Sequence, residues 1–150
     1  MTKDPKPPIP IKAIVVGSKT VGEWDSEWRR LDGDFNIRQS SVNKTVGLFR
    51  AVDGNDTMAI GQATEFENGG LRKRISDFRR KSDSNRKGFM GEYIRDNIKT
   101  LKLFVLCVGH DEEAAEVTKE LREFMKKLYN PPKNASELAI ARAILERRRK

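Results

Sequence analysis

Residues 53–56, Asp-Gly-Asn-Asp, give the strongest turn signal in the chain. Gly, Asn and Asp tolerate the left-handed backbone conformation that tight hairpin turns require. The segments on either side, 45–52 and 57–61, have the apolar content of short strands. The pattern therefore predicts an antiparallel hairpin in the middle of the chain, and the rest of the fold must pack around it.

Apolar residues at helical spacing follow the hairpin. Leu71, Ile75 and Phe78 recur at i, i+4 and i+7 and predict a helix over about 71–80. Helices with one apolar face need a sheet to pack on, and the most apolar run, 101–108, is expected to be a buried strand of it. The remaining predicted elements are a strand at 11–16, a short helix at 26–31, and helices that begin near Phe89, after Asp111 and after Asn134.

The order of these elements predicts a small α+β domain. We expect a mainly antiparallel sheet of three or more strands, flanked by helices. Three regions are expected: an N-terminal arm with a short strand and helix at 1–43, the main domain at 44–134, and a basic C-terminal helix at 135–150. Near the last boundary, Asn130-Pro131-Pro132 stops one helix, and Asn134 with Glu137 resembles a capping box.

The composition removes several classes of function. One cysteine, Cys107, and one histidine, His110, exclude a disulfide framework, a cysteine zinc site and a multi-histidine metal site. No apolar run approaches the roughly 18 residues of a membrane span. Residues 1–10 are polar and proline-rich and lack the apolar core of a secretory signal. We therefore expect a soluble, intracellular (cytoplasmic) protein that does not contact a membrane.

The net charge of +8 suits a polyanionic partner, most often nucleic acid. Phosphate contacts from Lys and Arg give an affinity that depends on salt and little on sequence. No aromatic residues interleave with the densest basic segment, so it does not predict a stacking platform for single strands. The candidate nucleic-acid-binding residues are Arg72, Lys73, Arg74, Arg79, Arg80, Lys81, Arg86 and Lys87.

Three separated segments resemble the GIY-YIG nuclease family. The hairpin carries Gly47-Leu48-Phe49 and Ala59-Ile60-Gly61, with Phe49 and Ala59 ten positions apart, as the two motif tyrosines are in that family. The next helix, 71–78, reads LRKRISDF and is similar to the family's LRKRL helix. Residues 128–134, LYNPPKN, resemble its closing PPxN segment. The resemblance covers about residues 44–134.

The resemblance implies a phosphodiester-cleaving fold with duplex DNA, rather than RNA, as its ligand. In the family, a helix glutamate holds one divalent metal, usually Mg²⁺, and the motif tyrosines position or deprotonate the attacking water. An arginine on the following helix stabilises charge on the phosphate. Developing oxyanion charge requires fixed donors and a cation of this kind.

Most of the implied site is substituted in this chain. Arg74 matches the family's arginine and is expected to contact phosphate. Phe49 and Ala59 stand at the tyrosine positions and supply no proton acceptor, and Gln62 stands where a lysine is common. Counting back from the PPxN segment places Arg122 at the metal-binding glutamate, and arginine does not ligate Mg²⁺.

A shifted or rebuilt catalytic site is the alternative. A slip of one residue brings Glu123 to the metal position, and Glu120 is the other candidate ligand for Mg²⁺ or Mn²⁺. His110 follows the apolar strand 101–108, and it is a weak candidate base because its ordinary pKa suits proton transfer near neutral pH.

Three functions therefore stay open. The first is nucleic-acid binding, to DNA rather than RNA, with little or no cleavage. The second is a divergent Mg²⁺-dependent endonuclease that uses Arg74 with Glu123 or Glu120. The third is a protein-binding regulator or inhibitor on a nuclease-like scaffold, with the proline-rich arm and the Trp24/Trp28 pair as its contacts. Nothing in the sequence indicates an oligomeric state.

Overall fold

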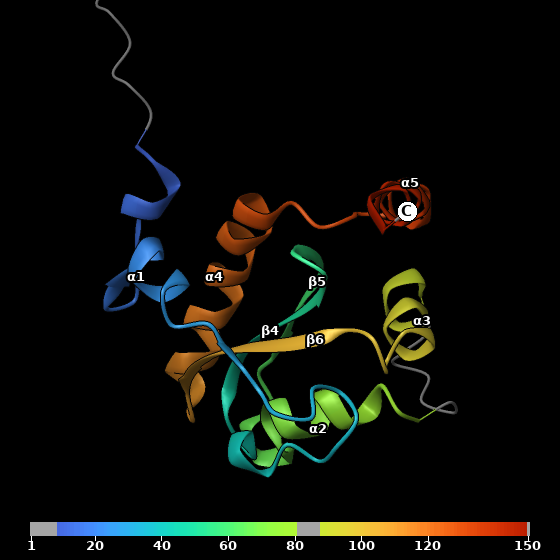
Figure 1. Ribbon diagram of the computed structural model, residues 1–150. Helices are drawn as coiled ribbons and strands as arrows, with labels where there is room; N and C mark the ends of the chain where they lie inside the picture. The colour runs from blue at the N-terminus through green and yellow to red at the C-terminus, as the bar shows by residue number, and fades with distance from the viewer. Residues whose placement is uncertain (1–8, 81–87, 150) are drawn as a thin grey trace, which may run out of the picture.

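A four-stranded antiparallel sheet forms the centre of the fold in the computed structural model, which describes residues 9–80 and 88–149 (Figure 1). The strands in spatial order are β3 (Arg29–Arg30), β6 (Lys102–Gly109), β4 (Val46–Asp53) and β5 (Asp56–Ala63). Every neighbouring pair in this sheet is antiparallel. The predicted α+β class, with an antiparallel sheet flanked by helices, is confirmed.

Strands β4 and β5 form the hairpin predicted from the turn at 53–56, with Asp53 opposite Asp56. Gly54 in the turn has a φ of 64°, which glycine adopts without strain. Strand β4 pairs with β5 on one side and with β6 on the other. Strand β5 therefore forms an edge of the sheet within the described part of the chain.

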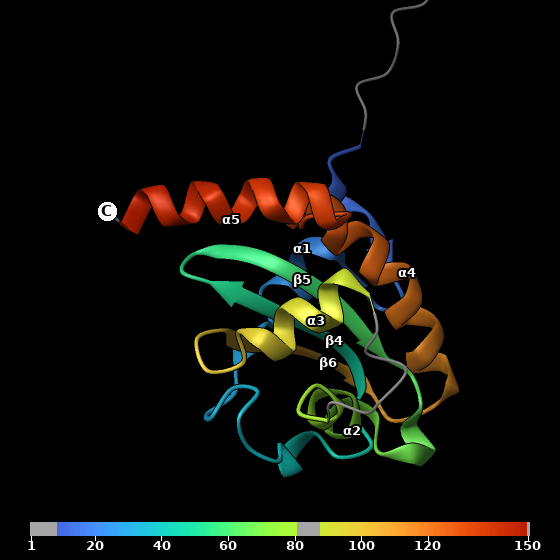
Figure 2. The ribbon, with the colours of Figure 1, turned by 90° about the vertical axis from the view of Figure 1, so that its right-hand side faces the viewer.

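One face of the sheet packs against α2 (Gly70–Asp77) and α3 (Phe89–Asp96), and residues of α5 (Ala135–Arg149) join the same core (Figure 2). Leu71, Ile75 and Phe78, which predicted the helix, are all buried in this core. Strand β4 contributes Phe49 to it. The helical periodicity thus identified the buried face of α2 correctly.

The opposite face packs against α1 (Val21–Asp25) and α4 (Glu112–Tyr129). Leu48 of β4 and Leu121 of α4 meet in this second core, together with Trp24 of α1. Leu48 and Phe49 are neighbours in sequence but enter different cores, because successive side chains in a strand point to opposite faces. Burial on both faces explains why apolar residues in 45–52 are not confined to alternate positions.

Arg50 of β4 is enclosed by three aromatic rings. Its guanidinium carbon lies 4.2 Å from the ring centre of Tyr129, 4.8 Å from that of Phe104 and 4.9 Å from that of Trp28. Burial lowers the pKa of Arg50 from its ordinary value. Because Trp28 packs on Arg50 and Trp24 is only 4% exposed, the two tryptophans pack inward rather than forming a contact surface.

Two short elements near the N-terminus differ from expectation. The strand expected at 11–16 is a 3-10 turn (Ile11–Ala13) followed by β1 (Val15–Val16), which pairs with β2 (Lys19–Thr20). The helix expected at 26–31 is wrong: α1 lies earlier, and strand β3 occupies 29–30. A capping box fixes the start of α1, because Glu23 N–H donates to Thr20 Oγ1 and Thr20 N–H donates to the Glu23 carboxylate.

The later helix ends follow the predicted signals. The Asp111 carboxylate accepts from Ala114 N–H at 2.8 Å and caps α4. Asn134 Oδ1 accepts from Glu137 N–H at 2.9 Å and caps α5, but the Glu137 carboxylate accepts from Lys133 N–H rather than from Asn134 N–H. The capping box is therefore only half formed. Within residues 9–80 and 88–149, no helix combines the length and apolar character needed to cross a bilayer.

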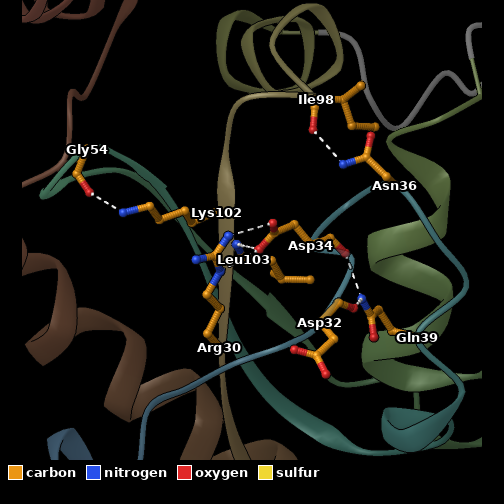
Figure 3. Close-up of polar contacts among 9 residues, drawn as sticks. All are labelled: Arg30, Asp32, Asp34, Asn36, Gln39, Gly54, Ile98, Lys102 and Leu103. Atoms are coloured by element: carbon orange, nitrogen blue, oxygen red, sulfur yellow. Dashed lines mark hydrogen bonds and ion pairs between the residues drawn. The ribbon is translucent and has the colours of Figure 1, made fainter.

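The loop after β3 is tied to the sheet through Asp34 (Figure 3). Its carboxylate accepts from Leu103 N–H at 2.9 Å and from two nitrogens of Arg30 at 2.9 and 3.1 Å. Farther along the loop, Gln39 Nε2 donates to the carbonyl oxygens of Asp32 and Asp34, at 2.8 Å each. Burial alone would raise the pKa of Asp34, but the hydrogen bonds from Arg30 and Leu103 outweigh it, so this pKa is lowered.

Candidate functional site

A cavity of about 410 Å³ lies at the edge strand β5, where side chains of α2, α3 and α4 converge. Its charged side chains are Arg74 of α2 and Arg122 of α4, and Gln62 of β5 adds a neutral polar group. No aspartate or glutamate is among the described residues that line it. The apolar part of the wall consists of Phe49, Ala59, Ile60, Phe78, Phe89, Met90 and Ile94.

The cavity brings together the positions that motif spacing assigned to one site. Phe49, Ala59, Gln62, Arg74 and Arg122 come from β4, β5, α2 and α4, and all five line it. These residues are far apart in the sequence, so their convergence is a property of the fold. The structure thus places each substituted motif position at the same hollow.

Phe49 and Ala59 line the cavity as buried apolar side chains and offer no reactive group. Their exposed fractions are 4% and 2%. The Phe49 ring packs edge-on against Phe78, with ring centres 5.5 Å apart, and lies across Gly61 on the neighbouring strand. Neither side chain carries a group that accepts or donates a proton. The two positions therefore shape the cavity without supplying acid–base chemistry.

Arg74 projects from the edge of the buried face of α2, and 27% of its side chain is exposed. Its Nη2 donates to Glu65 Oε1 at 2.9 Å. Burial of Glu65 opposes its charge, but Arg74 outweighs this effect, and the pKa of Glu65 is lowered from its ordinary value. Glu65 therefore stays ionised near neutral pH and balances the charge of Arg74.

Arg122 has no such counter-ion. Its Nε is buried and has no hydrogen-bond partner among the described residues. No ion pair links Arg122 to any carboxylate in residues 9–80 and 88–149. A buried donor without an acceptor is uncommon in folded proteins and often marks a functional role or an unseen ligand. The uncompensated positive charge of the cavity therefore resides mainly at Arg122.

The candidate metal ligands lie elsewhere on α4. Glu123 is 65% exposed, and its carboxylate lies 3.9 Å from Lys126 Nζ. Glu120 is exposed as well, and neither glutamate lines the cavity. Mg²⁺ and Mn²⁺ require oxygen ligands, usually carboxylates, and two arginines repel a cation. The described residues also contain no cluster of three His, Cys, Asp or Glu side chains. The donor set of this cavity does not fit the divalent metal that the resemblance implies.

His110 lies outside the cavity. It follows β6, is exposed, and its Nε2 lies 3.3 Å from Thr45 Oγ1. Thr45 directly precedes β4, at the opposite end of that strand from the hairpin turn. The structure does not place His110 with Arg74 and Arg122, where a catalytic base would be required.

A second hollow, of about 530 Å³, follows α2 and shares Arg74 with the first. It is polar, and Glu65, Glu67 and Asp77 also line it. Of the basic residues named from the sequence, Arg72, Lys73, Arg74 and Arg80 line it. Lys44 joins them from the loop before β4. Arg79 instead donates to the carbonyl of Asn36 at 3.1 Å, and Lys81, Arg86 and Lys87 lie outside the described residues.

A third hollow, of about 260 Å³, adjoins the first on the other side and shares Arg122 with it. Lys126 of α4 and Lys133, which precedes α5, line it. Shared lining residues connect the three hollows in series, and we call this series the basic track. Its basic residues are Lys44, Arg72, Lys73, Arg74, Arg80, Arg122, Lys126 and Lys133.

Lys44, Lys126 and Lys133 were not predicted as binding residues. Lys126 lies four residues after Arg122, one turn along the same face of α4, and this spacing was a usable signal. Lys44 and Lys133 are isolated in the sequence, and only the fold brings them to the track.

Comparison with protein families, with curated proteins and with solved structures found no match for this chain.

Proposed function

We propose that this chain binds nucleic acid through a GIY-YIG nuclease-like domain, that duplex DNA is its ligand, and that its substituted centre does not cleave the bound strand. The basic track carries the proposal. Basic side chains outnumber the acidic ones along its three hollows, and they come from α2, α4 and the segments flanking β4 and α5. A line of cations on one surface is the electrostatic footprint of a phosphate backbone.

Two observations support the nuclease-like scaffold. The three resembling segments lie on the β4–β5 hairpin, on α2 and at the end of α4, as the resemblance expects of a hairpin, the next helix and a closing segment. Phe49, Ala59, Arg74 and Arg122, which the motif spacing assigned to one site, line one cavity.

The chemistry of the cavity favours binding over cleavage. Hydrolysis of a phosphodiester needs a group that activates water and a cation that offsets the developing charge. Phe49 and Ala59 offer no base, and none of the described residues that line the cavity is a carboxylate that could hold a metal. What remains is a pair of arginines, which bind phosphate but do not generate a nucleophile.

The first experiment measures the affinity of the full chain for a fluorescently labelled duplex as the salt concentration rises. We expect log Kd to depend linearly on log salt, with a slope set by the number of phosphate contacts. Supercoiled plasmid incubated with the protein in Mg²⁺ or Mn²⁺ should stay uncut. Single-stranded DNA and duplex RNA serve as competitors and should displace the duplex less well.

Matched variants localise the binding surface. Arg72→Gln and Lys126→Gln each remove one charge from the basic track and should lower the salt slope by about 0.9. Lys119→Gln removes one charge from an exposed part of α4 that lies off the track, where Lys119 pairs with Glu116, and should leave the slope unchanged.

Other outcomes would favour the competing functions. Nicking that disappears in Arg74→Ala and in Glu123→Gln or Glu120→Gln would identify a divergent endonuclease. Absence of salt-sensitive DNA binding, together with a protein captured in pull-down, would identify a protein-binding regulator.

A further inference from the structure

The cavity at the edge of β5 has the composition of an anion site rather than a metal site. It is lined by two guanidinium groups and one amide, and by no carboxylate among the described residues. Glu65 balances Arg74 from the neighbouring hollow, at 2.9 Å, and it does not line this cavity. One positive charge, that of Arg122, is therefore left without a counter-ion among the described residues that line the cavity.

We propose that this cavity binds one phosphate group directly, between Arg74 and Arg122, without a divalent metal. Arginine suits this role because its planar guanidinium presents parallel N–H donors to phosphate oxygens. The buried Nε of Arg122, which has no acceptor among the described residues, would gain one when the anion enters. Arg74, with 27% of its side chain exposed, can share its charge between Glu65 and the ligand.

The rest of the wall indicates what the phosphate is attached to. Phe89, Met90, Phe78 and Ile94 provide apolar surface beside the two arginines. A volume of about 410 Å³ exceeds what an inorganic anion needs, and it leaves room for the sugar or base of one nucleotide unit. The ligand class is therefore a nucleotide phosphate, either an internal phosphodiester or a terminal phosphomonoester. This inference deepens the proposed function and rests on it, because it takes the phosphate from a bound nucleic acid.

The decisive variant is Arg122→Gln in the full chain, with Lys119→Gln on the same helix as its control. We expect Arg122→Gln to weaken duplex binding about ten-fold or more, because it removes charge-assisted hydrogen bonds to one phosphate. The salt slope should fall by about 0.9. Affinity in EDTA and in Mg²⁺ should be equal at matched ionic strength. Arg122→Lys, which keeps the charge but loses the fork of donors, should recover part of the affinity.

Thermal stability distinguishes a ligand-binding residue from a structural one. Arg122→Gln should melt no lower than wild type in the absence of ligand, since the buried Nε of Arg122 has no hydrogen-bond partner, and its side chain no ion pair, among the described residues. Inorganic phosphate should raise the melting temperature of wild type and of Lys119→Gln, but not that of Arg122→Gln.

The outcomes separate this inference from the proposed function. Duplex binding that Arg122→Gln leaves at the wild-type level would overturn the inference and leave the proposed function standing. If the chain does not bind duplexes, the proposed function fails, and phosphate stabilisation that depends on Arg122 would still establish the anion site. Absence of that stabilisation as well would overturn both. Duplexes of one sequence with 5′-phosphate or 5′-hydroxyl ends identify the source of the phosphate. Tighter binding of the 5′-phosphate duplex by wild type, but not by Arg122→Gln, indicates a terminal group. Equal affinity for the two duplexes indicates an internal phosphodiester.

Discussion

The hydrogen bond from Leu103 N–H to the Asp34 carboxylate fastens the loop after β3 to the sheet, at 2.9 Å. Leu103 is fully buried in the first core, and 18% of the Asp34 side chain is exposed. Asp34 has a φ of 50°, so a test of this contact must use a residue that tolerates the left-handed conformation. Asp34→Gly meets that condition and removes the only side-chain acceptor that Leu103 N–H has in the described structure.

The expected loss follows from leaving a buried donor unsatisfied. Such a group costs about 1–3 kcal/mol, and we expect about 2 kcal/mol for Asp34→Gly. In a domain of this size the melting temperature should fall by about 4–8 °C. Asp34→Asn keeps one oxygen for Leu103 N–H and should lose less. Urea unfolding of wild type and variants, followed by circular dichroism, measures the difference in the free energy of unfolding.

The control is Asp32→Gly, which makes the same substitution two residues earlier in the loop. The Asp32 side chain is exposed and makes no hydrogen bond within the described residues (Figure 3). Because folding lowers the pKa of Asp34, its contribution is fully present above the unfolded value of about 3.9. That contribution is lost as the pH falls through the folded pKa, so the difference between wild type and Asp34→Gly should shrink below about pH 4. Equal losses in Asp34→Gly and Asp32→Gly would refute this reasoning.

Three further measurements test the packing around the site. Gly61→Ala places a methyl group against the Phe49 ring and should destabilise the fold by about 1–3 kcal/mol, and a double-mutant cycle with Phe49→Ala should remove most of that cost. Arg50→Lys should cost about 1 kcal/mol in urea unfolding, because an ammonium stacks poorly among the three aromatic rings; an unchanged midpoint would contradict that role. Burial, aided by Asp53 for Tyr93 and by Asp25 for Tyr129, raises the pKa of both tyrosines to about 12. Absorbance titration should therefore show no phenolate near pH 10 in the native protein, but should show it in the protein unfolded in urea. Because the tyrosines ionise more easily when unfolded, the free energy of unfolding should decline from about pH 10 to 12.

The sequence predicted the elements that carry strong local signals. The turn at 53–56 fixed the β4–β5 hairpin, and Asp111 and Asn130 marked the two ends of α4. Strand β3 has only two residues, both arginines, and it exists because Arg29 and Arg30 pair with β6. No local sequence pattern predicts such a strand, because it is stabilised only by pairing with β6, more than seventy residues away.

The prediction also missed the start of α1, although the sequence contains a capping signal there. Thr20 and Glu23 have the spacing of a capping box, and the structure forms both of its hydrogen bonds. The helical spacing of Trp24 and Trp28 led to a predicted helix at 26–31, later in the chain than α1. Trp28 instead lies beyond α1 and packs on Arg50, so its spacing from Trp24 reflects tertiary packing.

At the candidate site, too, the sequence predicted some residues, and only the fold showed the others. The resemblance assigned Phe49, Ala59, Arg74 and Arg122 to one site, and the fold brings them to one cavity. The sequence predicted only the dense charges at 72–87 as a basic surface. The spacing of Lys126 from Arg122 was a further usable signal, whereas Lys44 and Lys133 reach the track only through the fold. Lys126 and Lys133 extend the track past Arg122, and this extension depends on how α4 crosses β5.

In the proposed function, Arg122 stands where the family that the chain resembles has a metal-binding carboxylate, and this difference does more than remove a ligand. A carboxylate in this cavity would attract a cation and hold phosphate only through it, so binding would depend on metal. An arginine at this position reverses the sign of the field, so we propose that the cavity attracts phosphate directly. Two arginines, with no carboxylate or histidine among the described lining residues, stabilise a bound phosphodiester but do not activate water, so we expect affinity without turnover. Metal-independent duplex binding, sensitive to Arg122 and insensitive to Glu123, is the combination that this reasoning requires.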